Sequence, residues 1–356
     1  MSHIKFLGLD GMRGIATLFV LLRHTGGYWG PFPFPRSYLA VDVFFVLSGF
    51  VIAHAYERRF HDGSMTASRF LVTRLIRLYP MYLVGMAIGL SWALSAMSRG
   101  VDVFSVAQGE LPRVLLLSLV FLPSHLDPAL FLFPLNGPAW SLFYELVVNG
   151  VYSVVQRWLT WPVLVALLAT IALLIGVVSY QVGGLDLGIT AGPKVMLGAS
   201  ARAFFGMGYG LLLYHGYRRG VRVPSALATA LGPIVLMSIV FMIPLFSRLN
   251  WLVDVVAVTV VLPGCVMWSA SSPTPLRLTA LFTVLGVISY PLYVLHWPLS
   301  ELGAVMLADT IARYRPMSGV VFTLTLLLLC ATVVRFVDES IRARLTARLL
   351  AYRARG

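Results

Sequence analysis

The chain consists of long, continuous apolar stretches separated by short polar segments. Stretches such as LVALLATIALLIGVVSY and FTLTLLLLCATVV do not alternate between apolar and polar residues, which favours helices over the strands of a membrane barrel. Lipid offers the backbone no hydrogen-bond partners, so apolar runs of about 20 residues predict membrane-spanning helices. The pattern predicts an all-α, polytopic bundle of about ten transmembrane helices, at residues 10–28, 38–56, 76–97, 139–157, 162–182, 196–215, 225–246, 251–270, 283–307 and 317–338.

A shorter apolar piece at 112–125 does not fit this series, because it is too short to cross a bilayer comfortably and its apolar run ends in proline. If this piece does not cross, 16 basic residues flank the spans on one face of the membrane and seven on the other. The more basic face of a membrane protein is the cytoplasmic one. We therefore expect a short or re-entrant helix near 112–125, with both termini in the cytoplasm.

The composition agrees with a membrane protein and indicates which kinds of ligand are not expected. Of the 356 residues, 59% are hydrophobic and 12% are charged, whereas soluble domains are about a quarter charged. The basic residues gather at span ends, which indicates membrane topology rather than nucleic-acid binding. The two cysteines, Cys265 and Cys330, have neither disulfide nor metal-ligand spacing. We expect one membrane domain at 1–340, a basic cytoplasmic tail at 341–356 and no metal site.

The first predicted helix carries ionisable side chains inside the membrane, where each one costs roughly 2.5–3.5 kcal/mol or more. Eleven positions separate Arg13 from His24, which is about 20° from three whole turns, so both lie on one face. Asp10 precedes Arg13 by three positions and shares that face. The stripe suggests a site that runs from the cytoplasmic end to beyond the midplane. The alternative is an Asp10–Arg13 pair at the water boundary and a histidine that merely bonds a neighbouring helix.

Other spans also contain polar side chains that predict a site. Arg74 and Arg77 share a face at the cytoplasmic end of the third span, where they either grip phosphates or only flank the membrane. Glu145 lies less than two turns from the outer end of its span, at a depth similar to that of His24. Asp42 falls in the outer half of the second span.

His296 lies between two prolines, Pro291 and Pro298. Because proline frees backbone carbonyls and kinks a helix, this stretch either shapes a cavity or only packs. Arg202 and Arg335 are further intramembrane charges, and the sequence assigns no partner to either.

Five segments occur in an order that resembles the membrane acyltransferase-3 family of bacterial integral-membrane O-acyltransferases. They are LDGMRGIATLFVLLRH, FFVLSGFVIA, RLIRLYPMYL, WSLFYE and LGVISYPLYVLHWPL. The resemblance runs from about residue 7 to 338. The family's hallmark arginine and histidine match Arg13 and His24, its paired arginines match Arg74 and Arg77, and its glutamate matches Glu145.

The resemblance implies an acyltransferase without a tightly bound cofactor and, in a short member such as this, without a fused esterase-like domain. Such a protein takes an acyl group, usually acetyl, from cytoplasmic acyl-CoA. It passes the group to a hydroxyl of an exopolysaccharide, a lipopolysaccharide or a related glycolipid. We expect it in the bacterial cytoplasmic (inner) membrane, and the oligomeric state stays open.

In the expected mechanism Arg74 and Arg77, with Tyr79 beside them, hold the CoA phosphates, and His24 is the general base. Arg13 and Asp10 complete the catalytic group, and Glu145 orients the imidazole or binds the sugar. We expect Asp42, Trp140, Tyr144 and His296 to bind the acceptor.

Two alternatives remain open from the sequence. Chemically, the acyl group either moves directly or rests on His24 as an acyl intermediate. Functionally, the same ionisable residues also suit a proton-coupled transporter or flippase of a glycan precursor. The absence of duplicated halves in the sequence argues against a transporter.

Overall fold

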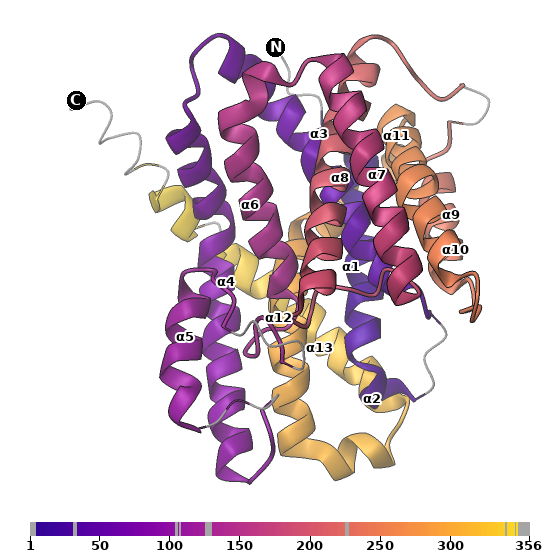
Figure 1. Cartoon of the computed structure of the whole chain (residues 1–356). Coiled ribbons are helices and arrows are strands. Elements are labelled where there is room, and N and C mark those ends of the chain that lie inside the picture. Colours follow the sequence, from indigo (N-terminus) through magenta and orange to yellow (C-terminus); the bar gives the residue numbers. More distant parts are fainter. Residues whose placement is uncertain are drawn as a thin grey trace.

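The computed structural model describes residues 5–30, 34–103, 106, 108–124, 130–224, 228–338, 340–345 and 347. Most of the predicted tail at 341–356 lies outside these residues. In the described part the regular structure is helical (Figure 1), which confirms the predicted all-α fold. The helices are α1 (Leu7–His24), α2 (Gly26–Trp29), α3 (Ala40–His61), α4 (Ala67–Ser98), α5 (Leu111–Leu119), α6 (Ala139–Val155), α7 (Trp161–Val182), α8 (Pro193–Arg218), α9 (Gly232–Met242), α10 (Asn250–Val256), α11 (Leu262–Ser271), α12 (Leu276–Arg313) and α13 (Met317–Val333).

Seven of the described helical segments are long and apolar enough to cross a membrane: 37–61, 67–98, 161–182, 193–218, 250–271, 276–313 and 317–345. The segment 250–271 joins α10 to α11 through five residues of π-helix. The predicted number of about ten is not confirmed. Helix α1 carries three charged residues, whereas α6 and α9 have only 17 and 11 residues.

The piece predicted to be short or re-entrant forms α5, which has nine residues. At 1.5 Å per residue, nine residues reach about 14 Å, less than half of the hydrocarbon thickness. Figure 1 shows α5 beside the lower half of α4. The hydroxyls of Tyr79 and Tyr82 on α4 donate to the carbonyls of Leu119 and Ser118, each at 2.7 Å. These bonds satisfy carbonyls at the end of α5 that the helix itself leaves unpaired.

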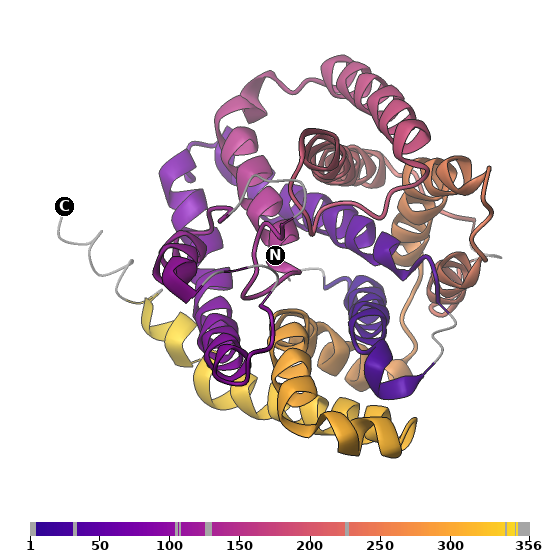
Figure 2. The same ribbon diagram turned by 60° about the horizontal axis from the view of Figure 1, so that its bottom comes forward.

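Helices α1 and α12 pack closely side by side because glycines remove side chains from their contact. A Cβ on Gly14 would lie 2.4 Å from Cβ of Leu285, and a Cβ on Gly286 would lie 2.6 Å from Cβ of Asp10. Such close approach is typical of small residues in membrane helices. Seen from its lower end, the bundle carries α13 on the outside, against α12 (Figure 2).

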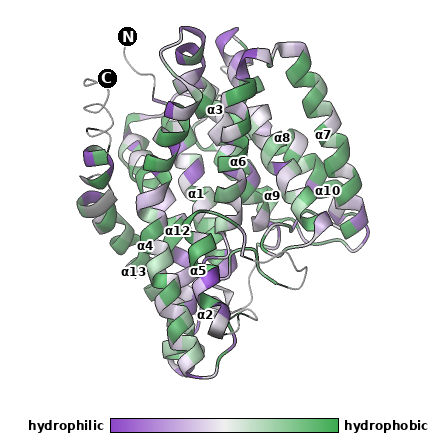
Figure 3. Cartoon of the chain, turned by 60° about the vertical axis from the view of Figure 1, so that its left-hand side comes forward, coloured by the Kyte–Doolittle hydropathy of each residue, from purple (hydrophilic) through white to green (hydrophobic). Residues whose placement is uncertain are grey.

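Hydrophobic residues run along many of the helices of the bundle (Figure 3). Large side chains there are exposed to the surroundings, among them Leu173 on α7 at 73% and Leu328 on α13 at 71%. An apolar exterior of this extent would be unstable in water and suits lipid. The protein is a multi-pass membrane protein.

Two ion pairs are fully buried between the helices. Arg202 on α8 donates to both carboxylate oxygens of Asp42 on α3, at 2.9 and 2.6 Å. Arg36 donates to Asp254 at 2.6 Å, and Tyr38 donates to the other oxygen of Asp254 at 2.7 Å. Each pair joins segments more than 150 positions apart in the sequence.

Candidate active site

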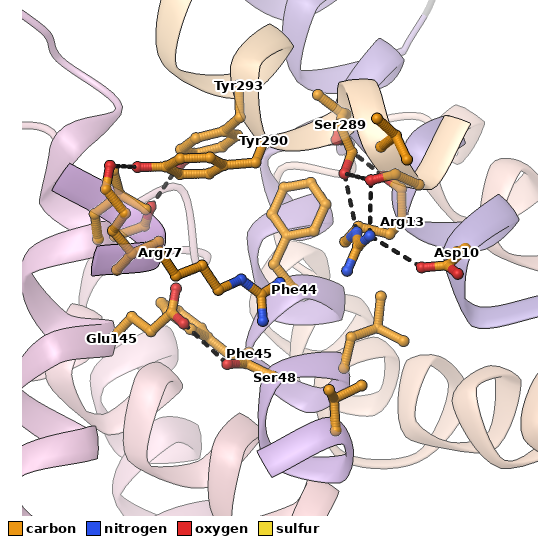
Figure 4. Close-up of a pocket in the computed structure, with 18 of the residues that line it drawn as sticks. Asp10, Arg13, Phe44, Phe45, Ser48, Arg77, Glu145, Ser289, Tyr290 and Tyr293 are labelled. Atoms are coloured by element: carbon orange, nitrogen blue, oxygen red, sulfur yellow. Dashed lines mark hydrogen bonds and ion pairs between the residues drawn. The ribbon is translucent and has the colours of Figure 1, made fainter. Parts of the chain in front are cut away.

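A cavity of about 340 Å³ lies among α1, α3, α4, α6 and α12 (Figure 4). Its charged lining is dominated by cations, and we call it the cationic cavity. The basic residues are Lys5, Arg13, Arg74, Arg77 and Arg342, and the acidic residues are Asp10 and Glu145. Five cations against two carboxylates suit an anionic ligand.

Arg13 is fixed in this cavity by bonds to its own helix and to α12. Its Nη2 donates to Asp10 at 2.9 Å and to the carbonyl of Gly286 at 2.7 Å, while Nε donates to Ser289 at 2.9 Å. Asp10 and Arg13 form the ion pair that the sequence offered as the alternative to a site, and the same guanidinium also lines the cationic cavity. Since three acceptors hold the guanidinium, its charge has a defined position in the cavity.

Arg74 and Arg77 enter the cationic cavity from α4, three positions apart. Arg74 is buried, forms an ion pair with Glu145, and leaves its Nε without a hydrogen-bond partner. Arg77 extends towards the middle of the cavity (Figure 4). Within the described part of the chain it has neither a hydrogen-bond nor an ion-pair partner. A partly buried cation without a partner is costly unless a ligand neutralises it.

Glu145 lies with Arg74 rather than beside His24, so the expectation of a common depth for Glu145 and His24 is wrong. Ser48 also donates to Glu145 Oε1, at 3.0 Å. The reason lies before α6. Residues 130–138 are largely buried, with Leu132 and Leu135 at 0% exposure. Helix α6 therefore starts inside the protein and not at the membrane surface. Glu145 lies deeper in the bundle than its position in the helix alone would indicate.

A second cavity of about 250 Å³ contains His24, and we call it the histidine cavity. Its charged lining includes Arg23, Asp186 and Arg202, and its aromatic lining includes Tyr38, Phe131 and Trp140. Two loops form one wall, joined by a bridge between Phe131 and Thr190 and by a bond from Leu132 N to Ile189 O at 2.9 Å. Arg23 and Asp186 form an ion pair in this lining.

His24 contacts His296, which is 0% exposed. Nδ1 of His24 lies 2.9 Å from Nε2 of His296, and Nδ1 of His296 lies 3.1 Å from the carbonyl of Leu292. A carbonyl only accepts, so we assign the proton of neutral His296 to Nδ1. Its Nε2 then accepts from Nδ1–H of His24. Neutral His24 therefore carries its lone pair on Nε2, which is the state that a general base requires.

The prolines of α12 contribute to this arrangement. Pro298 cannot donate to the carbonyl four positions earlier. That carbonyl belongs to Val294 and accepts instead from Asn136 Nδ2 at 3.0 Å. Proline thus ties the wall segment 130–138 to the helix that carries His296. Of the two alternatives that the sequence left open for this stretch, the structure favours the one in which it shapes a cavity, because Tyr290 and Tyr293 line cavities.

The structure places the residues expected to bind the acceptor in different surroundings. Trp140 lines the histidine cavity. Tyr144 lines neither cavity and donates to the carbonyl of Met196 at 3.2 Å. Asp42 is 1% exposed and paired with Arg202, so it has no surface for a substrate. His296 contacts His24 and supports it.

Tyr79 was expected to assist CoA binding, but it is not among the residues that line the cationic cavity. Its hydroxyl is occupied by the carbonyl of Leu119. The structure therefore gives Tyr79 a role in holding α5, and only Arg74 and Arg77 of the expected donor residues face the cavity.

Tyr293 and Asp186 are among the lining residues of these cavities that the sequence did not predict. Tyr293 lines both, and its position three residues before His296 was a usable signal, because such residues share a helical face. Asp186 lies in a loop between spans, and no sequence signal ties it to Arg23.

The fold and the site together define a polytopic membrane protein with two ligand-sized cavities in its helical bundle, each lined in part by charged side chains. The family described as "Acyltransferase domain" matches residues 6–336, nearly the whole chain. The chain therefore belongs to this family and is a membrane acyltransferase.

Named relatives agree with the family. The chain is 43% identical to "Protein 2 in picA locus" of Rhizobium radiobacter over 169 residues, which cover 82% of that protein and 43% of this one. It is 36% identical over 78 residues to proteins of Staphylococcus aureus strains COL and N315 that carry the provisional name of O-acetyltransferase. Those 78 residues are 22% of this chain and only 12% of the staphylococcal proteins. No solved structure is significantly similar to the chain.

Proposed function

We propose that the protein is an O-acetyltransferase that moves an acetyl group from acetyl-CoA to a hydroxyl of a cell-envelope glycan. One observation carries the proposal. Helix α1 presents Arg13 to a cation-rich cavity and His24 to a second cavity that shares lining residues with the first. A donor with phosphates and an acceptor with a hydroxyl then meet along one helix.

The cationic cavity supports the binding of the CoA phosphates. Arg77 has no partner within the described residues, and Arg74 has an unpaired Nε. Guanidinium groups bind phosphate oxygens through two parallel hydrogen bonds, which favours arginine over lysine at such a site. The cavity lies at the end of the bundle for which the arrangement of basic residues predicts a cytoplasmic location, the compartment that supplies acyl-CoA.

His24 supports direct transfer by general-base catalysis. Its Nε2 takes the proton of the acceptor hydroxyl while the oxygen attacks the thioester carbonyl. The C–S bond breaks, and the CoA sulfur leaves with the proton that His24 returns. His296 accepts from Nδ1–H of His24 throughout and so stabilises the imidazolium that forms. In the alternative course Nε2 attacks the thioester itself and carries the acyl group to the hydroxyl.

The histidine cavity supports a carbohydrate acceptor, because it offers aromatic faces together with charged hydrogen-bonding groups. Trp140 and Tyr38 supply rings, and Asp186 and Arg23 supply the polar groups. The name of the staphylococcal relatives supports a hydroxyl as the acceptor group. We place the acceptor among exopolysaccharides, lipopolysaccharides and related glycolipids, and the protein in the inner membrane.

Mass spectrometry of envelope glycans tests the proposal. In cells that lack the gene, each sugar that is normally modified should be lighter by the mass of one acetyl group. Wild-type protein expressed from a plasmid should restore the acetyl groups. Protein with His24→Ala is the matched control and should restore nothing. A glycan that disappears from the surface altogether, instead of losing acetyl groups, would indicate a transporter or flippase and would contradict the proposal.

A further inference from the structure

The two cavities have two lining residues in common, Val41 on α3 and Tyr293 on α12. Both side chains are buried, at 7% and 6% exposure. One side of each faces the cationic cavity, and the other faces the cavity that contains His24. These residues therefore stand at the boundary between the cations and the histidine.

Tyr293 is held firmly at this boundary. Its hydroxyl lies 2.5 Å from Ser141 Oγ and 3.1 Å from the carbonyl of Pro138. Both partners belong to the start of α6, so the phenol connects α12 to α6. A ring whose polar end is bonded at two points resists rotation out of its place.

The neighbours of Tyr293 show which way its ring faces. The ring of Phe44, which lines the cationic cavity, packs edge-on at 5.5 Å between centroids. The ring of His296 lies at 6.0 Å on the way to His24. Figure 4 shows Tyr293 next to Tyr290 at the edge of the cationic cavity. The tyrosine thus separates the phosphate-binding side from the catalytic pair.

We propose that Val41 and Tyr293 form a partition that the acyl end of the donor has to reach or cross, and that their bulk sets the largest acyl group transferred. The inference rests on the proposed function. The charged end of CoA stays with the arginines, whereas His24 lines the other cavity, so the thioester has to come to the boundary. In this proposal one valine and one anchored ring limit the size of the acyl group that reaches His24.

The expected discrimination follows from the physics of apolar pockets. One methylene too many in a packed apolar site costs between about tenfold and two hundredfold in rate. Removing two methyl groups from Val41 should therefore admit longer acyl chains, whereas a larger residue should exclude even acetyl. Val43, two positions along α3, is 0% exposed and lines neither cavity, so it offers a matched control.

A chemical trap measures this passage without any knowledge of the acceptor. The chain with His24→Cys, and with Cys265→Ala and Cys330→Ala, presents a single thiol at position 24. The thiolate attacks the thioester carbonyl of acyl-CoA, the bond to the CoA sulfur breaks, and CoA leaves as the thiol with the proton of the cysteine. Intact-mass spectrometry then counts acylated protein after incubation with acetyl-CoA, butanoyl-CoA or octanoyl-CoA.

Three substitutions are compared in this background, and size-exclusion chromatography verifies folding. With Val41→Ala the ratio of octanoyl to acetyl labelling should rise about tenfold, and with Val43→Ala it should not change. With Val41→Phe acetyl labelling should fall about tenfold while the affinity for CoA stays within about twofold, since the phosphates bind elsewhere. Equal ratios in the two alanine variants would overturn the partition.

A second result would also overturn it while leaving the donor site intact. This is a thiol that reacts with methyl methanethiosulfonate but not with acetyl-CoA, in a protein that still binds acetyl-CoA. If acetyl-CoA does not bind to the unmodified chain at all, the proposed function itself fails, and the two failures are thereby distinguished.

Discussion

Nδ1 of His24 lies 2.9 Å from Nε2 of His296, although 272 positions separate the two residues in the chain. Helix α1 supplies the first imidazole, and α12 supplies the second. His296 in turn bonds the carbonyl of Leu292, which fixes the proton on Nδ1 of His296. This backbone carbonyl therefore sets the tautomer of both rings, a role that a carboxylate has in other catalytic histidines.

If His296 acts as the hydrogen-bond acceptor of His24, two substitutions of His296 should have different effects. Glutamine places an amide oxygen near the position of Nε2 and still accepts from His24, so His296→Gln should keep kcat within about tenfold of the wild-type value. His296→Leu removes the acceptor and should lower kcat about a hundredfold without changing the KM for acetyl-CoA. Steady-state kinetics of purified protein measure both. Equal losses in the two variants would mean that His296 only fills space.

Arg77 offers the cleanest test of the donor site, because no partner within the described residues loses a bond when it is replaced. Loss of charge-assisted bonds of about 1.5–3 kcal/mol predicts that Arg77→Ala weakens CoA binding between about tenfold and a hundredfold. Arg77→Lys should recover part of the affinity, since lysine keeps the charge but cannot form the two parallel hydrogen bonds of a guanidinium group. Calorimetry with CoA measures the change.

The matched control for Arg77 is Arg59→Ala, an exposed arginine that does not line the cavity. Its affinity for CoA should equal that of the wild-type protein. If Arg77→Ala and Arg59→Ala bind CoA equally well, the arginines of α4 serve only the topology of the chain.

Asp42 is expected to act on stability and not on acceptor binding, because it is buried in an ion pair with Arg202. Breaking a buried pair on one side costs about 3–5 kcal/mol. Asp42→Leu should therefore lower the thermal midpoint and the yield of folded protein. Asp42→Leu combined with Arg202→Met should restore much of both, because no unpaired charge remains. A single variant that folds normally but has a raised KM for the acceptor would return Asp42 to the substrate site.

The positions of the loops predict on which side of the membrane each cavity opens. Gln181 at the end of α7 and Val221 after α8 are both exposed. The ends of α7 and α8 that precede these loops lie at opposite ends of the bundle (Figure 1). In a background without Cys265 and Cys330, an impermeant thiol reagent added outside the cell should label Gln181→Cys and spare Val221→Cys. The reverse pattern would place the cationic cavity on the outside, away from cytoplasmic acyl-CoA.

The sequence predicted the elements of the site whose signals are local. The spacing of Asp10, Arg13 and His24 along one helix was sufficient to place them on one face, and all three contribute to the cavities or their lining. The depth expected for Glu145 is wrong, because it requires α6 to begin at the membrane surface. Buried irregular segments such as 130–138 have no periodicity that a sequence reveals.

Partners between distant helices could not be predicted for a related reason. Nothing in the sequence indicates that Arg202 faces Asp42 or that Arg74 faces Glu145, because the rotation of each helix depends on the packing of all the others. The polar residues themselves were found, since any charge inside a span stands out. The polar residues inside the predicted spans thus indicated which residues belong to the site, and the fold determined which of them contact one another.

The most direct test of the account is single-turnover transfer of labelled acetyl from acetyl-CoA to envelope glycans by protein with His24→Ala. Its exposed counterpart His61→Ala is the control. Loss of the general base predicts a rate at least about a hundredfold below the wild-type rate, with CoA affinity unchanged, whereas His61→Ala should transfer normally. A purified His24→Ala protein that transfers acetyl at a rate close to the wild-type rate would contradict the central claim that His24 is the base.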